Sequence, residues 1–138
     1  MVELLIGKKG TGKTKMLLEH VNNAVAVAKG NVVFISDDTR RNMYDIKSSV
    51  RMIDTKDFDI ESYGELIGFV CGVVSGNYDI TNIFIDGIFK IVGTTELDGF
   101  EEFLVRMEKM SKQFNISFVI PLSIDAETAP DYIKKYAQ

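Results

Sequence analysis

The sequence predicts an α/β fold, a three-layer α/β/α arrangement around a mainly parallel sheet of four to five strands. Two observations predict it. Short apolar runs alternate along the chain with segments whose apolar residues recur at helical spacing, which is the pattern of strands joined by helices. A glycine-rich segment also joins the first apolar run to the first helical pattern, and such strand, loop and helix units build parallel sheets.

Length and composition indicate one soluble domain over residues 1–138. The apolar fraction of 46% is enough for a hydrophobic core. Acidic residues outnumber basic ones by 20 to 16 and no basic run stands out, so nucleic acid is not favoured as a partner. The single cysteine, Cys71, lies in an apolar segment and is expected to be a small buried side chain. No signal-peptide pattern or membrane-length apolar stretch occurs, and we therefore expect a cytoplasmic protein without a membrane partner.

The first unit consists of a strand, a glycine-rich loop and a helix. The apolar run 2–6 predicts a buried strand, and apolar residues at helical spacing follow from Leu17 to Ala28, with Gly30 expected to end that helix. Between them lies a full match to the pattern G-x-x-x-x-G-K-T, formed by Gly7, Lys8, Lys9, Gly10, Thr11, Gly12, Lys13 and Thr14. In such a loop, backbone N–H groups surround a phosphate, the lysine reaches the β- and γ-phosphate oxygens, and the threonine hydroxyl binds Mg²⁺.

This pattern predicts nucleotide binding by residues 7–15. Lys13 is expected to contact the phosphates and to assist catalysis, Thr14 to bind the metal, and Lys15 to flank the site. The alternatives are an ordinary glycine-rich turn or a site that has lost its ligand.

The middle of the chain predicts two more strands and a helix. Residues 31–36 form an apolar run that ends at Asp37 and Asp38, residues 39–49 predict a mobile loop or a short helix, and residues 50–53 predict a small extra strand. An apolar helix is expected from about Ser62, closed by residues 75–77.

The next strand, 83–86, ends in the carboxylate of Asp86. There the carboxylate would bind Mg²⁺ opposite Thr14. The alternative is that Asp86 caps a turn with Gly87.

The last third predicts a loop, a helix, a strand and a short terminal helix. Residues 88–95 lack a clear period and predict a loop. Asp98 with Glu101 fits a capping box that starts a helix with one apolar face through Phe114. Residues 116–120 predict the last strand, ended by Pro121, and the pattern around Thr128 predicts a short helix near the C-terminus.

Taken together, the sequence resembles the P-loop NTPase superfamily over nearly its whole length. It resembles most the RecA-like ATPase branch, with a Walker A motif at residues 7–14 and a Walker B element at Asp86. This resemblance implies a sheet order of 1-4-3-2, counting the four main expected strands along the chain. It also implies that Ser123, near the end of the fourth strand, senses the γ-phosphate, unless it is only a turn serine.

The resemblance is weakest where catalysis is expected. RecA-like ATPases orient the attacking water with a glutamate, but Gly87 follows Asp86 here. At the end of the second strand, Asp37 and Asp38 are the candidates for this base, the alternative being that they cap the following turn. Without a well-placed base we expect slow or partner-triggered hydrolysis. Arg40 and Arg41 follow these acids and are either phosphate-binding arginines or a solvated charge cluster.

The function expected from the sequence is that of an ATP-binding P-loop protein with Mg²⁺ as its cofactor. No N-K-x-D motif for guanine occurs, which favours ATP over GTP. We expect a weak or partner-stimulated ATPase that acts as a nucleotide-dependent switch or as a subunit of an assembly, with a homo-oligomer or a protein partner implied by analogy with the family. The alternatives are a small-molecule or nucleoside kinase and a nucleotide-binding regulatory module without turnover.

Overall fold

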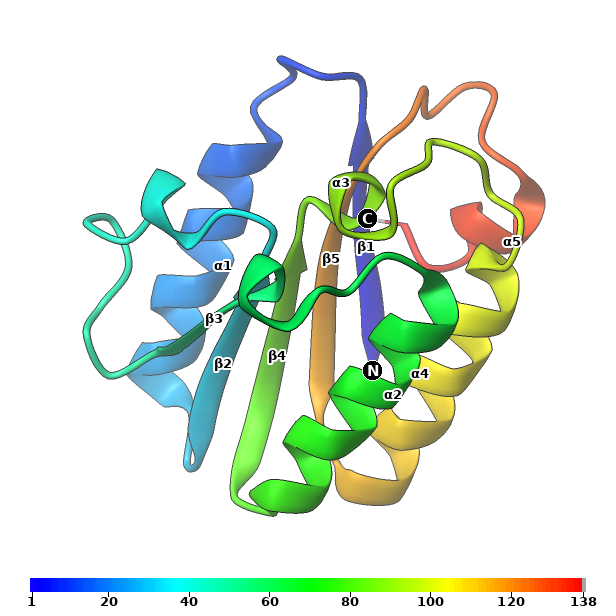
Figure 1. Ribbon diagram of the computed structural model, residues 1–138. Coiled ribbons are helices and arrows are strands. Elements are labelled where there is room, and N and C mark those ends of the chain that lie inside the picture. Colours follow the sequence, from blue (N-terminus) through cyan, green and yellow to red (C-terminus); the bar gives the residue numbers. More distant parts are fainter. Residues whose placement is uncertain (138) are drawn as a thin grey trace.

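A five-stranded, all-parallel sheet forms the centre of the computed structural model, which describes residues 1–137 (Figure 1). The strand order is β1-β5-β4-β2-β3. The strands are β1 (Val2–Gly7), β2 (Asn31–Ser36), β3 (Arg51–Asp54), β4 (Ile80–Asp86) and β5 (Ser117–Ser123). The four main strands lie in the order that the resemblance implies, and β3 extends the sheet beside β2.

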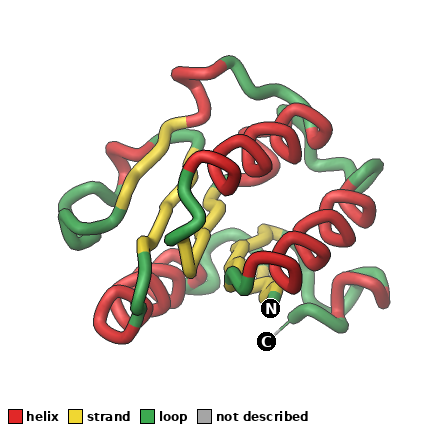
Figure 2. Tube along the Cα trace, turned by 90° about the horizontal axis from the view of Figure 1, so that it is seen from below, coloured by secondary structure: helices red, strands yellow, loops and turns green. Residues whose placement is uncertain are grey.

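Helices cover both faces of the sheet. Helix α1 (Lys13–Val27) lies on one face, and α2 (Tyr63–Gly76) and α4 (Phe100–Phe114) lie together on the other, as the view along the strands in Figure 2 shows. The shorter elements are α3 (Ile88–Val92), α5 (Asp131–Lys134) and two 3-10 turns, η1 (Thr39–Arg41) and η2 (Thr55–Phe58). This arrangement fits the predicted three-layer α/β/α fold.

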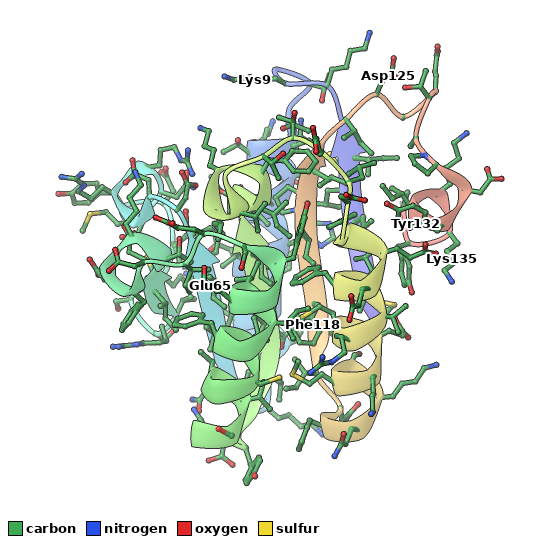
Figure 3. The ribbon with its side chains drawn as sticks, turned by 45° about the vertical axis from the view of Figure 1, so that its right-hand side comes forward. Lys9, Glu65, Phe118, Asp125, Tyr132 and Lys135 are labelled. Carbon is green, nitrogen blue, oxygen red and sulfur yellow. The ribbon has the colours of Figure 1, made fainter. Side chains whose placement is uncertain are left out.

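Alternation along the buried strands produces a core on each face. Phe34 and Phe84 pack toward α1, whereas their neighbours Ile35 and Ile85 pack toward α2 and α4. Successive side chains of a strand point to opposite faces, so a strand buried on both sides reads as a continuous apolar run. Phe118 of β5 is fully buried and lies between the sheet and the α2–α4 pair (Figure 3). Cys71 of α2 packs against this core but is only partly buried.

Several predicted boundaries are wrong. Strand β4 begins at Ile80, before the predicted run 83–86. Helix α1 ends at Val27, so Gly30 lies beyond it; a side chain at Gly30 would overlap the backbone of Asp79. Strand β5 continues through Pro121 to Ser123. Proline has no backbone N–H, but β5 pairs with β4 only as far as Val119, so Pro121 interrupts no hydrogen bond between these two strands.

A further wrong boundary is the start of α4. The N-cap of α4 is Gly99, with φ of 90° and no side-chain cap, and not Asp98. A reciprocal cap occurs instead on α2, where Ser62 accepts a hydrogen bond from Glu65 N (3.1 Å) and the Glu65 carboxylate accepts one from Glu61 N (2.9 Å). The segment 88–95, expected as a loop, also contains helix α3.

The chain after α5 lies along the outer side of β1. Leu4 N donates a hydrogen bond to Tyr136 O (2.8 Å), and Leu4 forms a parallel bridge with Ala137. The strand that leads into the glycine-rich loop is therefore paired on both sides. Within residues 1–137, none of the helices has the length and apolar character needed to cross a membrane.

Candidate functional site

The predicted site residues gather at the edge of the sheet where the parallel strands end. The glycine-rich loop (residues 7–14), helix α3 and the segment after β5 lie at this edge (Figure 1). A cavity of about 520 Å³ opens at this edge between the glycine-rich loop, the segment after β2, the segment after β4 and the end of β5. Its lining consists of Lys9, Gly10, Gly12, Lys13, Thr14, Arg41, Asn42, Asp86, Gly87, Ile88, Phe89, Lys90, Thr95, Pro121 and Ser123. In open α/β sheets, ligands bind outside the carboxyl ends of the strands.

The glycine-rich loop is folded around the ammonium group of Lys13. Lys13 Nζ donates hydrogen bonds to Gly7 O (2.7 Å) and Lys8 O (2.8 Å), and Thr11 Oγ1 donates to Lys8 O (2.6 Å). A lysine ammonium has three donors, so one N–H remains for a ligand. Burial lowers the pKa of Lys13, while the nearby Asp86 carboxylate opposes that shift.

Two glycines give the loop its shape. Gly10 and Gly12 have φ values of 86° and 87°, in the left-handed region that side chains other than glycine disfavour. Gly12 is also the N-cap of α1, and no side chain accepts a hydrogen bond from the first turn of this helix. The first N–H groups of a helix have no partner within the helix, so those of α1 are left for an anion. Thr14, in the same turn, lines the cavity.

Asp86 supplies the carboxylate that lines the cavity. It is the last residue of β4, pairs in register with Ser36 of β2, and its side chain is 19% exposed. Burial raises the pKa of Asp86; Arg41 opposes this rise and Asp37 adds to it. The carboxylate is therefore a partly desolvated anion that a cation would stabilise.

Arg41 joins the ends of β2 and β4. Its Nη2 atom is 2.7 Å from Asp37 Oδ1 and 3.7 Å from Asp86 Oδ2. Burial by itself would lower the pKa of Arg41, but the hydrogen bond and charge of Asp37, together with the charges of Asp86 and Asp38, outweigh it and the net shift is upward. Asp37 is only 5% exposed, and a Cβ atom at Gly87 would overlap its carboxylate. Neither of the acids predicted as a base, Asp37 or Asp38, lines the cavity.

Asp38 caps the turn that follows β2. Its carboxylate accepts a hydrogen bond from Arg40 N (3.1 Å) at the start of η1, and Arg40 Nε lies 3.8 Å from the same oxygen. The Arg40 side chain is 88% exposed. Of the two neighbouring arginines, Arg41 faces the cavity and Arg40 faces solvent.

The remaining predicted residues lie around the rim. Ser123 pairs in register with Gly7, which places it beside the glycine-rich loop. Lys8 Nζ lies 3.5 Å from Asp125 Oδ2 in the segment after β5, and Figure 3 shows Lys9 and Asp125 at the same end of the molecule. Lys15 is exposed and does not line the cavity.

The side chains present fit a magnesium ion held together with a phosphate. Among residues 1–137, no group of three or more His, Cys, Asp and Glu side chains could enclose a metal ion. The Thr14 hydroxyl and the Asp86 carboxylate are oxygen ligands that line one cavity. Mg²⁺ keeps several waters and is commonly held by one or two protein oxygens plus substrate phosphates, so two protein ligands suffice.

Sequence reasoning missed two features of the site and one cavity elsewhere in the molecule. Lys90 and Thr95 line the cavity from a segment expected to be a featureless loop, and no pattern pointed to them. The contact between Arg41 and Asp37 had only one signal, their spacing of four residues. A second cavity, of about 270 Å³, lies between the far ends of α2 and α4 and contains none of the predicted site residues.

No protein-family model matches this chain, and no curated protein sequence matches it. The functional assignment therefore rests on the residues and their geometry.

Proposed function

We propose that this protein binds Mg·ATP at the glycine-rich loop and is a small P-loop NTPase of the RecA-like kind. One observation carries the proposal: a G-x-x-x-x-G-K-T loop, shaped around its own lysine, opens onto a cavity that also contains the Thr14 hydroxyl and the Asp86 carboxylate. These are the groups that a nucleotide phosphate and its magnesium ion require.

Each group has a defined task in this proposal. The N–H groups of the loop and of the first turn of α1 donate to phosphate oxygens, and the third donor of Lys13 reaches the β- and γ-phosphates. Thr14 and Asp86 would hold Mg²⁺, which when bound neutralises charge on the β- and γ-phosphate oxygens. Ser123, beside Gly7, is within the part of the rim from which a hydroxyl would contact the terminal phosphate.

Hydrolysis by the isolated chain is expected to be slow. Among the described residues, Asp86 is the one acid that lines the cavity. Asp37 is engaged with Arg41 and Asp38 with its own turn, so a base for the attacking water requires a rearrangement or a partner. Charge stabilisation and positioning of the attacking group supply most of the catalysis in phosphoryl transfer. A site that does not position the attacking water therefore binds nucleotide well but hydrolyses it slowly. This behaviour suits a nucleotide-dependent switch or a subunit of an assembly.

A kinase is the second candidate, and the extent of the cavity favours it. The lining continues beyond the phosphate loop to Phe89, Lys90 and Thr95 of the segment after β4. An aromatic ring, an ammonium and a hydroxyl are side chains that would hold a small polar acceptor. A regulatory module that binds nucleotide without turnover is the third candidate.

Calorimetry with ATP tests the proposal, first with Mg²⁺ and then with EDTA. The wild-type protein should bind ATP more tightly with Mg²⁺, and Asp86→Asn should keep much of the Mg²⁺-free affinity while losing most of the Mg²⁺ enhancement. An enhancement that is unchanged in Asp86→Asn would refute the metal assignment. If millimolar Mg·ATP alters neither the amide resonances nor the melting temperature of the wild-type protein, the nucleotide proposal itself fails.

A second assay separates the candidate activities. Phosphate release and ADP formation are measured with ATP alone and with a panel of nucleosides. ADP formation that requires an acceptor favours the kinase, and phosphate release without an acceptor favours the ATPase. Binding without either activity, with or without candidate partner proteins, favours the regulatory module.

A further inference from the structure

One guanidinium group holds two carboxylates at the edge of the proposed metal site. Arg41 Nη2 is 2.7 Å from Asp37 Oδ1 and 3.7 Å from Asp86 Oδ2. The contact with Asp37 is a charge-assisted hydrogen bond, whereas the contact with Asp86 is an ion pair that is too long for a hydrogen bond. Arg41 is therefore attached firmly to Asp37 and loosely to Asp86.

The surroundings of these groups make the arrangement sensitive to a further cation. The Asp37 and Asp86 side chains are 7% and 19% exposed, whereas the Arg41 side chain is 38% exposed and reaches solvent. A divalent ion on Asp86 would lie within a few ångströms of the guanidinium, where like charges repel strongly because water screens them poorly. The Arg41–Asp86 contact and a metal ion therefore compete for the same carboxylate.

Arg41 lies on a turn that is tied to the edge of the sheet. The turn η1 is capped by Asp38, and Thr39 N donates a hydrogen bond to Asp54 Oδ2 (3.2 Å) at the end of β3. Asp54 in turn caps η2 through Lys56 N (3.0 Å). A displacement of Arg41 would therefore reach the outer strand of the sheet through two short turns.

We propose that Arg41 is a latch on Asp86 that a metal ion displaces. In the metal-free protein the guanidinium neutralises Asp86 and disfavours the binding of a cation by itself. A polyphosphate adds the negative charge that lets the metal enter, so metal and nucleotide bind together. When the metal occupies Asp86, Arg41 keeps Asp37 and swings away from Asp86, and the turn at 39–42 moves with it. This inference rests on the proposed function for the assignment of Asp86 as metal ligand.

The test is a titration of the nucleotide-free full chain with Mn²⁺. Binding is measured from the electron paramagnetic resonance signal of the Mn²⁺ that stays free. Arg41→Gln removes the latch, and Arg40→Gln is the matched control because it removes the same charge from the same turn. We expect Arg41→Gln to bind Mn²⁺ at least about tenfold more tightly than wild type, and Arg40→Gln to stay within about twofold. Asp86→Asn added to Arg41→Gln should abolish the gain.

A destabilised variant would not obscure the result. Arg41→Gln leaves Asp37 buried without its charged partner, so Asp37→Asn combined with Arg41→Gln provides a second variant without that penalty, compared with Asp37→Asn combined with Arg40→Gln. In the wild-type protein, amide exchange of residues 39–42 should also be faster with Mg·ATP than with ATP and EDTA.

Three results would overturn the latch. They are an unchanged or weaker Mn²⁺ affinity of Arg41→Gln, an equal gain in Arg40→Gln, and a gain that survives Asp86→Asn. The nucleotide-free titration does not depend on ATP. A protein that binds no ATP but shows the expected Mn²⁺ gain would refute the nucleotide proposal and keep the latch, and normal Mg·ATP binding without the gain would refute the latch alone.

Discussion

Replacing Gly87 with alanine probes the packing between the ends of β2 and β4. Gly87 has φ of 74°, and an added Cβ atom would overlap the Asp37 carboxylate. The left-handed backbone costs alanine about 1 kcal/mol. Moving the carboxylate also weakens its 2.7 Å hydrogen bond with Arg41, which is worth about 1–2 kcal/mol once the partial exposure of the guanidinium is allowed for.

The total expected loss in the free energy of unfolding is therefore about 2–3 kcal/mol, or a melting temperature lower by roughly 6–12 °C for a domain of this size. Gly93→Ala is the matched control: Gly93 has φ of 77°, and nothing lies within 4 Å of its added Cβ atom. It should lose only about 1 kcal/mol. Urea unfolding and calorimetry measure both variants. Equal losses would show that the Asp37 carboxylate does not constrain residue 87, and the geometry described for the site would be wrong.

Two further predictions concern the glycine-rich loop and the edge of the sheet. Lys13→Ala should weaken Mg·ATP binding by about 2–3 kcal/mol, roughly 30- to 150-fold in calorimetry, because it removes the charge and the one N–H that remain for phosphate and leaves Gly7 O and Lys8 O without their donor. Lys29→Ala, an equal change in net charge at an exposed position after α1, should bind like wild type. Burial would raise the pKa of Asp54, but hydrogen bonds from Lys56 N and Thr39 N outweigh it and lower the pKa. Because the pKa is lower in the folded protein, the Asp54 carboxylate stabilises the fold at pH values above the pKa of about 3.9 that it has in the unfolded chain. This stabilisation is lost as the pH falls through the pKa of the folded state. Asp54→Ala should therefore cost about 1–2 kcal/mol at pH 7 and clearly less at pH 3 in urea unfolding, and an equal cost at both pH values would contradict the role of the carboxylate.

The parts of the fold that the sequence predicts are those decided by local patterns. The strands are continuous apolar runs buried on both faces, and the glycine-rich loop has a spacing that its backbone requires. The wrong boundaries depend on tertiary context. Asp98 has the right spacing for a cap, but the positive φ of Gly99 starts α4 without it, and Pro121 is tolerated because β4 no longer pairs with β5 there.

The site shows the same division. The sequence indicates the loop and Asp86, because each follows a strand with a recognisable pattern. It does not indicate that Arg41 contacts Asp37 and Asp86, because that contact depends on how closely the ends of β2 and β4 approach. Gly87 illustrates the limit best: in the sequence it is only a residue that cannot act as a base, whereas in the structure it makes room for the Asp37 carboxylate.

The peptide that follows α5 has a consequence for how copies of this chain could associate. Because its backbone already occupies the outer side of β1 at Leu4, a second molecule cannot add a strand there without first stripping that peptide away. Among the described strands, the free hydrogen-bonding side left for sheet extension belongs to β3, only four residues long and linked through Asp54 to the turn that carries Arg41. Self-assembly through the sheet would thus involve the strand that is linked to the turn of Arg41, and not the strand that leads into the glycine-rich loop.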